Sequence, residues 1–176
     1  MDASLKRQLC WIGGAFLFIF ALDQLSKFLI IQKIPQDAAF RGDVFFHFTH
    51  QRNTGIIGGA FGSIPWVAKV LPFFALGILY YLFRQLNRAS LVQAISYGMI
   101  WGGALGNIVD RMRLGWVTDF FQFNFYFIPF NFPWKYYPAF NIADAGIMIG
   151  VFTLLFTLNP NPEESTEAEK HAPSNS

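Results

Sequence analysis

The sequence predicts an all-α integral membrane protein with four transmembrane helices and a small β-sheet outside the membrane. Its composition supports this fold class, because 53% of the 176 residues are hydrophobic and only 14% are charged, against roughly 25% charged residues in soluble proteins. A further observation is that the apolar residues gather in four stretches, each close to the ~20 residues that a helix needs to cross a bilayer. The net charge of +2, without a basic cluster, gives no indication of nucleic-acid binding.

The four predicted spans are separated by two long connections and one short one. The first span covers residues 8–31, and its length without a small-residue cleavage site argues against a removed signal peptide. The others are Trp66 to Phe83, Leu91 to Val109 and Phe140 to Leu158. The short connection, residues 84–90, contains two arginines and no acid. We therefore expect this connection and both termini to lie on the cytoplasmic side.

Both long connections then lie on the extracytoplasmic side. Residues 33–65 contain an imperfectly alternating stretch and a glycine-rich one, which predict a few short strands in a small surface sheet. Residues 112–139 are dense in aromatic side chains, as is typical of a segment at the bilayer interface. We expect residues 1–158 to form a single membrane domain. Residues 159–176, which hold all four glutamates, are expected to be a disordered cytoplasmic tail.

Few ionisable residues lie in the predicted spans, and each needs a partner there. Asp23 and Lys27 are four residues apart on the first span, so they share a helix face and can form an ion pair. That pairing, or extension of the lysine to the interface, is a structural explanation and favours a supporting role. Asn107, Asp110 and Arg111 close the third span, where three polar groups must be satisfied by one another or by neighbours.

Two further aspartates are predicted to lie at one depth, because Asp119 follows the third span shortly and Asp144 begins the fourth. Asn141 and Asp144 have an ordinary structural explanation as a helix cap and a first-turn acid. Two carboxylates that share a site cannot both ionise cheaply, so one of them keeps a proton. Such a pair supplies a general base and a general acid together, which is the chemistry of an aspartic protease.

Other classes of function have weaker support in the sequence. His47 and His50 are not accompanied by a third ligand, so we expect no metal and no other cofactor. A small proton- or ion-coupled transporter would use Asp23, Lys27 and Asp144 as a relay, but that function requires carboxylates near the middle of the membrane. A membrane scaffold in which the polar groups serve only as caps and ion pairs is a third alternative.

Five motifs, taken together and in chain order, resemble lipoprotein signal peptidase (signal peptidase II), a family of bacterial membrane aspartyl peptidases. The motifs are Asp23-Gln-Leu-Ser-Lys27, Asn53-Thr-Gly55, Gly102-Gly-Ala-Leu-Gly-Asn107-Ile-Val-Asp110-Arg111, Val117-Thr-Asp119-Phe120 and Asn141-Ile-Ala-Asp144. The resemblance implies that Asp119 and Asp144 are the catalytic pair. It also implies a set of substrate-binding and supporting residues, namely Asp23, Lys27, Asn53, Gly55, Asn107, Asp110, Arg111 and Asn141.

The resemblance further implies a location in the bacterial inner membrane, with both termini cytoplasmic and the site facing the periplasm or cell exterior. The sheet within residues 33–65 would cradle the substrate, and the loop within residues 112–139 would act as a flap. The implied substrate is a prolipoprotein whose lipobox cysteine carries diacylglycerol, cleaved just before that cysteine. The implied inhibitor is the peptide antibiotic globomycin, membrane lipid is the implied surrounding partner, and a monomer is expected.

Overall fold

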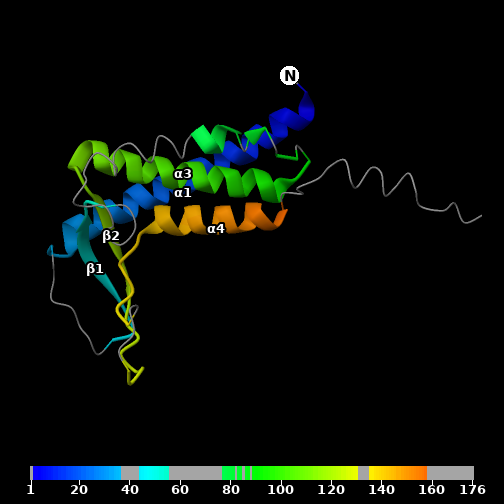
Figure 1. Ribbon diagram of the computed structural model, residues 1–176. Helices are drawn as coiled ribbons and strands as arrows, with labels where there is room; N and C mark the ends of the chain where they lie inside the picture. Colours follow the sequence, from blue (N-terminus) through cyan, green and yellow to red (C-terminus); the bar gives the residue numbers. More distant parts are fainter. Residues whose placement is uncertain are drawn as a thin grey trace, which may run out of the picture.

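The computed structural model describes residues 2–36, 44–55, 77–81, 83–84, 86–87, 89–130 and 135–157. Three long helices lie side by side, and a two-stranded sheet projects from one end of them (Figure 1). The elements are α1 (Ala3–Lys33), β1 (Phe46–Asn53), α3 (Leu91–Leu114), β2 (Val117–Phe123) and α4 (Ile142–Thr157). Most of the predicted span from Trp66 to Phe83, and the whole tail at 159–176, lie outside the described residues, although residues 77–81 are helical.

The ends of α3 follow from capping residues. The N-cap residue is Ser90, whose hydroxyl accepts the N–H of Gln93 at 3.3 Å, as expected of an N-cap. The C-cap residue is Gly115, which has a left-handed φ of 86° and donates its N–H to the carbonyl of Arg111. Glycine adopts this conformation without strain. The predicted third span stops at Val109, whereas the helix continues to Leu114. The additional turn carries Asp110 and Arg111 on a regular helix beyond the apolar stretch.

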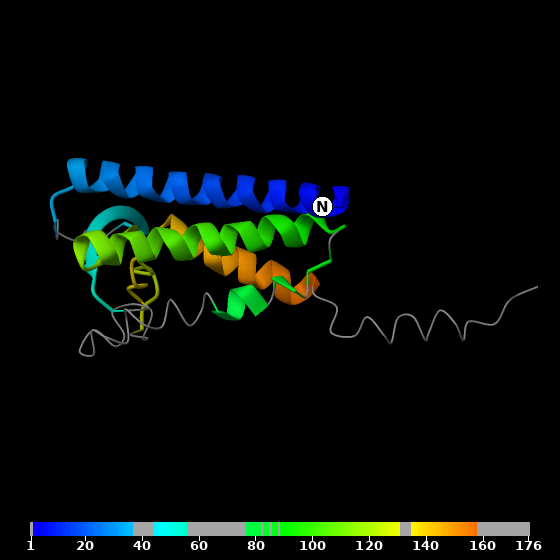
Figure 2. The ribbon, with the colours of Figure 1, turned by 90° about the horizontal axis from the view of Figure 1, so that it is seen from above.

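Helix α3 packs against α1 on one side and α4 on the other, and Figure 2 shows α1 and α3 running alongside each other. Glycines permit this close approach. A Cβ added at Gly102 would lie 2.6 Å from the backbone carbonyl oxygen of Phe16 on α1, and one added at Gly103 would strike the carbonyl of Ala143 on α4. Small residues that let backbones meet are typical of helix packing in membranes.

Many large apolar side chains are exposed, and several charged side chains are buried, which is unlike the pattern of a soluble protein. Phe18 on α1 is 66% exposed and Phe156 on α4 is 76% exposed, whereas Asp23 and Lys27 are almost completely buried. An apolar exterior around a polar interior is expected where lipid is the solvent. In the described part of the chain, α1 is the one helix that is both long and apolar enough to cross a membrane, and α4 is a shorter apolar helix.

The sheet pairs β1 antiparallel to β2, with Phe46 opposite Phe123 and Asn53 opposite Val117. The predicted small sheet is present, but its location differs from the prediction of a sheet within 33–65 and a loop at 112–139. Among the described residues, one strand comes from each of these two connections. Aromatic contacts between the strands explain the pairing, since the ring centroids of Phe46 and Phe123 lie 5.1 Å apart and cross-strand aromatic pairs stabilise sheets.

Candidate active site

All ten residues predicted to form or support a site belong to one connected network of hydrogen bonds and ion pairs. The network lies at the end of the helices from which the sheet projects (Figure 1). It joins α1, α3, α4 and both strands. Its members are Asp23, Lys27, Asn53, Gly55, Asn107, Asp110, Arg111, Asp119, Asn141 and Asp144.

The ammonium group of Lys27 is the centre of the buried part of this network. It forms ion pairs with Asp23 at 2.8 Å and Asp110 at 3.1 Å, and it donates to the side-chain oxygen of Asn107 at 3.0 Å. These three acceptors match the three N–H donors of a lysine. The ion pair predicted from the spacing of Asp23 and Lys27 is therefore present, and Asp110 extends it from α1 to α3.

Asn107 connects this ion cluster to Asp144. Its side-chain oxygen accepts from Lys27, while its amide nitrogen donates to Asp144 Oδ1 at 2.8 Å. Because Lys27 can only donate, the orientation of the Asn107 amide is fixed, with its nitrogen directed at the carboxylate. The Oδ1 atom of Asp144 therefore accepts a hydrogen bond from the amide nitrogen of Asn107.

Asn141 contacts both of the predicted catalytic aspartates. Its amide nitrogen donates to Asp119 Oδ1 at 2.7 Å, and its amide oxygen accepts the backbone N–H of Asp144 at 3.0 Å. In return, Asp144 Oδ2 accepts the backbone N–H of Asn141 at 3.2 Å. This is the reciprocal arrangement of a capping box, so the ordinary explanation for these residues is correct. The same cap also fixes Asp144 relative to Asp119.

Asp119 lies in β2 and is positioned by the register of the sheet. Gln51 on β1 is its direct partner, and Asn53 lies two residues further along the same face. A diagonal neighbour of this kind is within reach of a long side chain, and the Asn53 amide donates to Asp119 Oδ2 at 2.9 Å. Both carboxylate oxygens of Asp119 thus accept an amide, one from Asn53 and one from Asn141.

The electrostatic environment of Asp119 favours its protonated form. Burial, and then the nearby negative charge of Asp144, raise the pKa of the Asp119 carboxyl from 3.8 to about 7. The hydrogen bonds from Asn53 and Asn141 act in the opposite direction, because a donor stabilises the charged carboxylate. Near neutral pH a proton is therefore available at this position.

The ion cluster also holds the backbone beside each of these two aspartates. Asp23 Oδ1 accepts the N–H of Ala143, the residue before Asp144, at 3.0 Å. Asp110 Oδ2 accepts the N–H of Thr118, the residue before Asp119, at 3.2 Å. A helix start and a strand start are therefore tied to the same buried charges.

Sequence reasoning did not identify these backbone donors, nor the part taken by Gln24. The Gln24 amide donates to Asp23 at 3.2 Å and to Asp110 at 3.3 Å. Its position next to Asp23 in the first motif was the available signal. However, its contact with Asp110 depends on the packing of α1 against α3, which no local pattern in the sequence specifies.

Arg111 and Gly55 close the network at the start of the glycine-rich segment. The Arg111 guanidinium donates to the backbone oxygen of Gly55 at 3.0 Å, and the N–H of Gly55 donates to the side-chain oxygen of Asn53 at 2.9 Å. The Nε of Arg111 is buried and has no acceptor among the described residues. Arg111 therefore places a positive charge beside the two aspartates. Its Nε–H is the donor that has no acceptor among the described residues.

The geometry can supply general acid–base catalysis. Two carboxylates of unlike environment lie within one hydrogen-bonded unit, and the raised pKa of Asp119 allows the pair to retain one proton near neutral pH. Amides from Asn53, Asn107 and Asn141 fix the orientation of both carboxylates. A water molecule and a carbonyl group placed between them would meet a base on one side and an acid on the other.

Comparisons with known proteins show which proteins this chain is similar to. The family model described as signal peptidase (SPase) II matches residues 15–159. A lipoprotein signal peptidase of Chlorobium luteolum is 34% identical over 160 residues, covering 86% of this chain and 95% of that protein. A lipoprotein signal peptidase of Microcystis aeruginosa is also 34% identical, covering 89% and 95%. A solved bacterial membrane enzyme structure superposes with a TM-score of 0.68 at 26% identity, covering 90% of this chain and 91% of that one.

Proposed function

The chain belongs to the signal peptidase II family and is an aspartic peptidase of a bacterial membrane, and from this premise we propose that Asp119 and Asp144 are its catalytic dyad. The observation that carries the assignment is the position of Asn141, whose side chain contacts Asp119 and whose backbone and side chain both contact Asp144. The substrate is a prolipoprotein with a diacylglyceryl-modified lipobox cysteine, and the bond cleaved is the one just before that cysteine.

In the proposed reaction the dyad holds one proton. The ionised carboxylate takes a proton from a water molecule, whose oxygen forms a bond to the scissile carbonyl carbon. The protonated carboxyl donates its proton to the carbonyl oxygen, giving a neutral tetrahedral intermediate. When the carbon–nitrogen bond breaks, the amine takes the proton that the dyad received from water. One hydroxyl group of the intermediate returns its proton to the other carboxylate, which restores the singly protonated pair. The signal peptide leaves with a new carboxyl terminus, and the lipid-modified cysteine gains a free α-amino group.

The remaining network residues support this chemistry without transferring protons. Lys27 is saturated by three acceptors, so it acts as a fixed charge that holds Asp23, Asp110 and Asn107 in place. The Arg111 guanidinium and the carboxamide of Asn53 are the groups available to hold the substrate backbone or stabilise developing negative charge. Because Lys27 is fully paired, the relay required by the transporter alternative has no support from this arrangement.

The proposed membrane orientation follows from the position of the site on the helices. The dyad lies at the end of the bundle from which the sheet projects (Figure 1), opposite the end that carries Lys6 and Arg7. With both termini in the cytoplasm, the dyad faces the periplasm or cell exterior. The described residues between β2 and α4, 124–130 and 135–141, provide the flap. The protein works as a monomer, and globomycin competes with the lipidated substrate.

The dyad is tested by Asp119→Asn and Asp144→Asn, each assayed on a diacylglyceryl-modified prolipoprotein. We expect either change to abolish cleavage, because an amide can neither take a proton from water nor return one to the amine. Asp2→Asn is a matched control, since an asparagine also caps a helix and Asp2 lies at the start of α1. Membrane insertion and the thermal midpoint of each variant are measured alongside.

Near-normal turnover by either dyad variant would show that the aspartates have been wrongly assigned. A prolipoprotein whose lipobox cysteine is replaced by serine tests the substrate separately. We expect the wild-type enzyme to leave this unlipidated protein uncut, and efficient cleavage of it would contradict the proposed substrate while leaving the dyad intact.

A further inference from the structure

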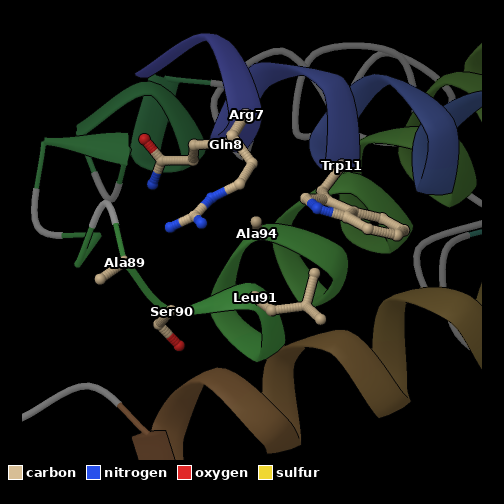
Figure 3. Close-up of a pocket in the computed structure, with 7 residues that line it drawn as sticks. All are labelled: Arg7, Gln8, Trp11, Ala89, Ser90, Leu91 and Ala94. Atoms are coloured by element: carbon tan, nitrogen blue, oxygen red, sulfur yellow. The ribbon is translucent and has the colours of Figure 1, made fainter. Parts of the chain in front are cut away.

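A second polar site lies at the opposite end of the bundle from the dyad. Between the first turns of α1 and the start of α3 is a cavity of about 190 Å³. Figure 3 shows the Arg7 side chain reaching from α1 into the space beside Gln8, Ala94 and Ser90. Arg7 is the only charged residue among the described residues that line the cavity, which are Arg7, Gln8, Trp11, Ala89, Ser90, Leu91 and Ala94.

Gln8 indicates that this cavity is built for a ligand. Its side chain is only 3% exposed, and its amide Nε2 is buried without an acceptor among the described residues. A buried amide donor of this kind is costly to leave unsatisfied. Because Gln8 lines the cavity, an acceptor placed there would satisfy it.

The start of α3 adds a second source of donors. Leu91 is the first residue of this 24-residue helix, and the first N–H groups of a helix have no partner inside it. Of these groups, the N–H of Gln93 donates to the Ser90 hydroxyl. The N-terminal end of a helix also carries a partial positive charge that favours anions. The cavity therefore combines a guanidinium, an unsatisfied amide and a helix N-terminus, which together suit a phosphate group.

The wall of the cavity is held in place by buried hydrogen bonds. Gln93, which is 5% exposed, accepts the N–H of Asn87 at 2.7 Å and donates to the carbonyl of Thr157 at 2.6 Å. Asn87 in turn accepts the N–H groups of Ala89 and Ser90. The segment that carries Ala89 and Ser90 is thus fixed to α3 and to the end of α4.

The apolar side chains at the rim of the cavity indicate that the phosphate belongs to a lipid. Trp11 is 48% exposed and Leu91 is 46% exposed, so exposed apolar side chains border the cavity. Trp11 lies 22 residues before Lys33 on α1, which is roughly 33 Å at 1.5 Å per residue and close to the ~30 Å thickness of the hydrocarbon layer. Tryptophan and lysine at those two levels mark the two membrane interfaces.

We propose that this cavity binds the phosphate of a membrane phospholipid, with the headgroup between Arg7, Gln8 and the start of α3 and the acyl chains along Trp11 and Leu91. Asp23, which supports the dyad, is about 22 Å away along α1, judged from the 15-residue interval between Gln8 and Asp23 at 1.5 Å per residue. The site is therefore separate from the peptidase chemistry, and it does not depend on the proposed catalytic assignment.

The test measures lipid binding by the full-length protein in a phosphate-free maltoside detergent, using native mass spectrometry and the thermal midpoint. The probes are dioleoylphosphatidylglycerol, dioleoylglycerol without a phosphate, and inorganic phosphate. We expect the phospholipid to bind and raise the midpoint, and the other two to have little effect. If dioleoylglycerol binds as tightly as the phospholipid, or inorganic phosphate alone gives the same rise, the proposed lipid phosphate site is wrong.

Two variants and a matched control locate the site. We expect Arg7→Gln to weaken phospholipid binding about tenfold, as the loss of a charge-assisted hydrogen bond would, and Gln8→Met to weaken it several-fold. Lys6→Gln removes the same charge from the adjacent residue, which does not line the cavity, and should retain nearly full binding. Equal losses for Lys6→Gln and Arg7→Gln would indicate general surface attraction and overturn the proposal.

The Gln8→Met variant also separates ligand binding from a structural role. Because the Gln8 amide nitrogen has no acceptor in the part of the chain that the structure describes, its replacement by an apolar side chain of similar size should leave the lipid-free midpoint unchanged or higher. The rise caused by phospholipid should become smaller. A lower lipid-free midpoint with undiminished phospholipid binding would show that Gln8 serves the fold alone, and the proposal would fail.

Discussion

Asp23 on α1 accepts the backbone N–H of Ala143 on α4 at 3.0 Å, so a residue deep in one helix fixes the start of another. The donor directly precedes Asp144 in the chain, at the end of the helix where the first N–H groups lack internal partners. Asp23 is fully buried, and its other oxygen is held by Lys27 at 2.8 Å. The position of Asp144 is therefore set by an acid that belongs to neither the dyad nor its helix.

This relationship predicts that Asp23 acts on turnover through geometry. Asp23→Asn keeps a side-chain oxygen that can accept the Ala143 N–H, whereas Asp23→Leu removes both the charge and the acceptor. We expect Asp23→Leu to lower kcat by roughly 10²-fold, the order of effect of misplacing a catalytic group by about 1 Å. Asp23→Asn should lose about tenfold, as for one charged hydrogen bond. Steady-state kinetics should show little change in KM for either variant, and equal activity of the two would refute a positioning role.

Removal of Lys27 should affect stability more than any other single change in the network. Lys27→Met leaves the buried carboxylates of Asp23 and Asp110 without their shared cation, and breaking a buried ion pair costs about 3–5 kcal/mol. The measurement is the free energy of unfolding in detergent. Lys33→Met is the control, because Lys33 lies in the last turn of the same helix and is exposed.

A second variant checks that the loss in Lys27→Met comes from uncompensated charge. Adding Asp23→Asn to Lys27→Met removes one of the two carboxylates, so the double variant should recover part of the stability. If the double variant is instead as unstable as the sum of the two single changes, the coupling between Asp23 and Lys27 is negligible and the ion cluster is not what holds this end of the bundle.

Much of this arrangement could be predicted from the sequence, for reasons that are local. Apolar stretches of sufficient length mark α1 and α4, and the four-residue spacing of Asp23 and Lys27 places both on one helix face. Asn141 and Asp144 are three residues apart at a helix start, which is the spacing of a capping box. Each of these patterns can be read from the sequence without knowing the rest of the fold.

The parts that could not be predicted depend on contacts between distant segments. The pairing of β1 with β2 brings residues 46–53 against residues 117–123, and its register includes a bulge between Phe48 and Gln51 that no alternation pattern reveals. The backbone donors at Thr118 and Ala143 have no side-chain signature at all. A motif therefore identifies the residues of the site, but the packing of the helices decides which backbone groups they hold.

The activity of the dyad should fall as the pH rises through about 7. The pKa of Asp119 is raised to about 7 by burial and by Asp144, so above that pH the pair loses the single proton needed for general acid catalysis. The alkaline limb of kcat/KM, which reports on the free enzyme, should therefore lie near that value. A flat profile between pH 6 and 9 would show that this proton is not required.

A variant on β1 tests which group causes the alkaline limb of the kcat/KM profile. Asn53 lowers the pKa of Asp119 by donating to its carboxylate, so Asn53→Leu should raise the pKa and move the limb to higher pH. Gln51→Leu is the matched control, because the Gln51 amide on the same strand donates to Gln122 instead. A shift to lower pH in Asn53→Leu would mean that the titrating group is not Asp119.

Gly106 on α3 should tolerate no side chain, because a Cβ there would lie 2.5 Å from Asp23 Oδ2. Gly106→Ala must displace either the carboxylate or the helix, and since Asp23 also holds Lys27 and Ala143, the displacement reaches the dyad. We expect a loss of about 1–3 kcal/mol in stability, typical of overpacking, together with a lower kcat. Gly14→Ala on α1 is the control, since a Cβ there meets nothing within 4 Å. It should be neutral or gain about 0.5–1 kcal/mol from helix propensity, and a Gly106→Ala enzyme as stable and active as this control would show that Asp23 is free to move.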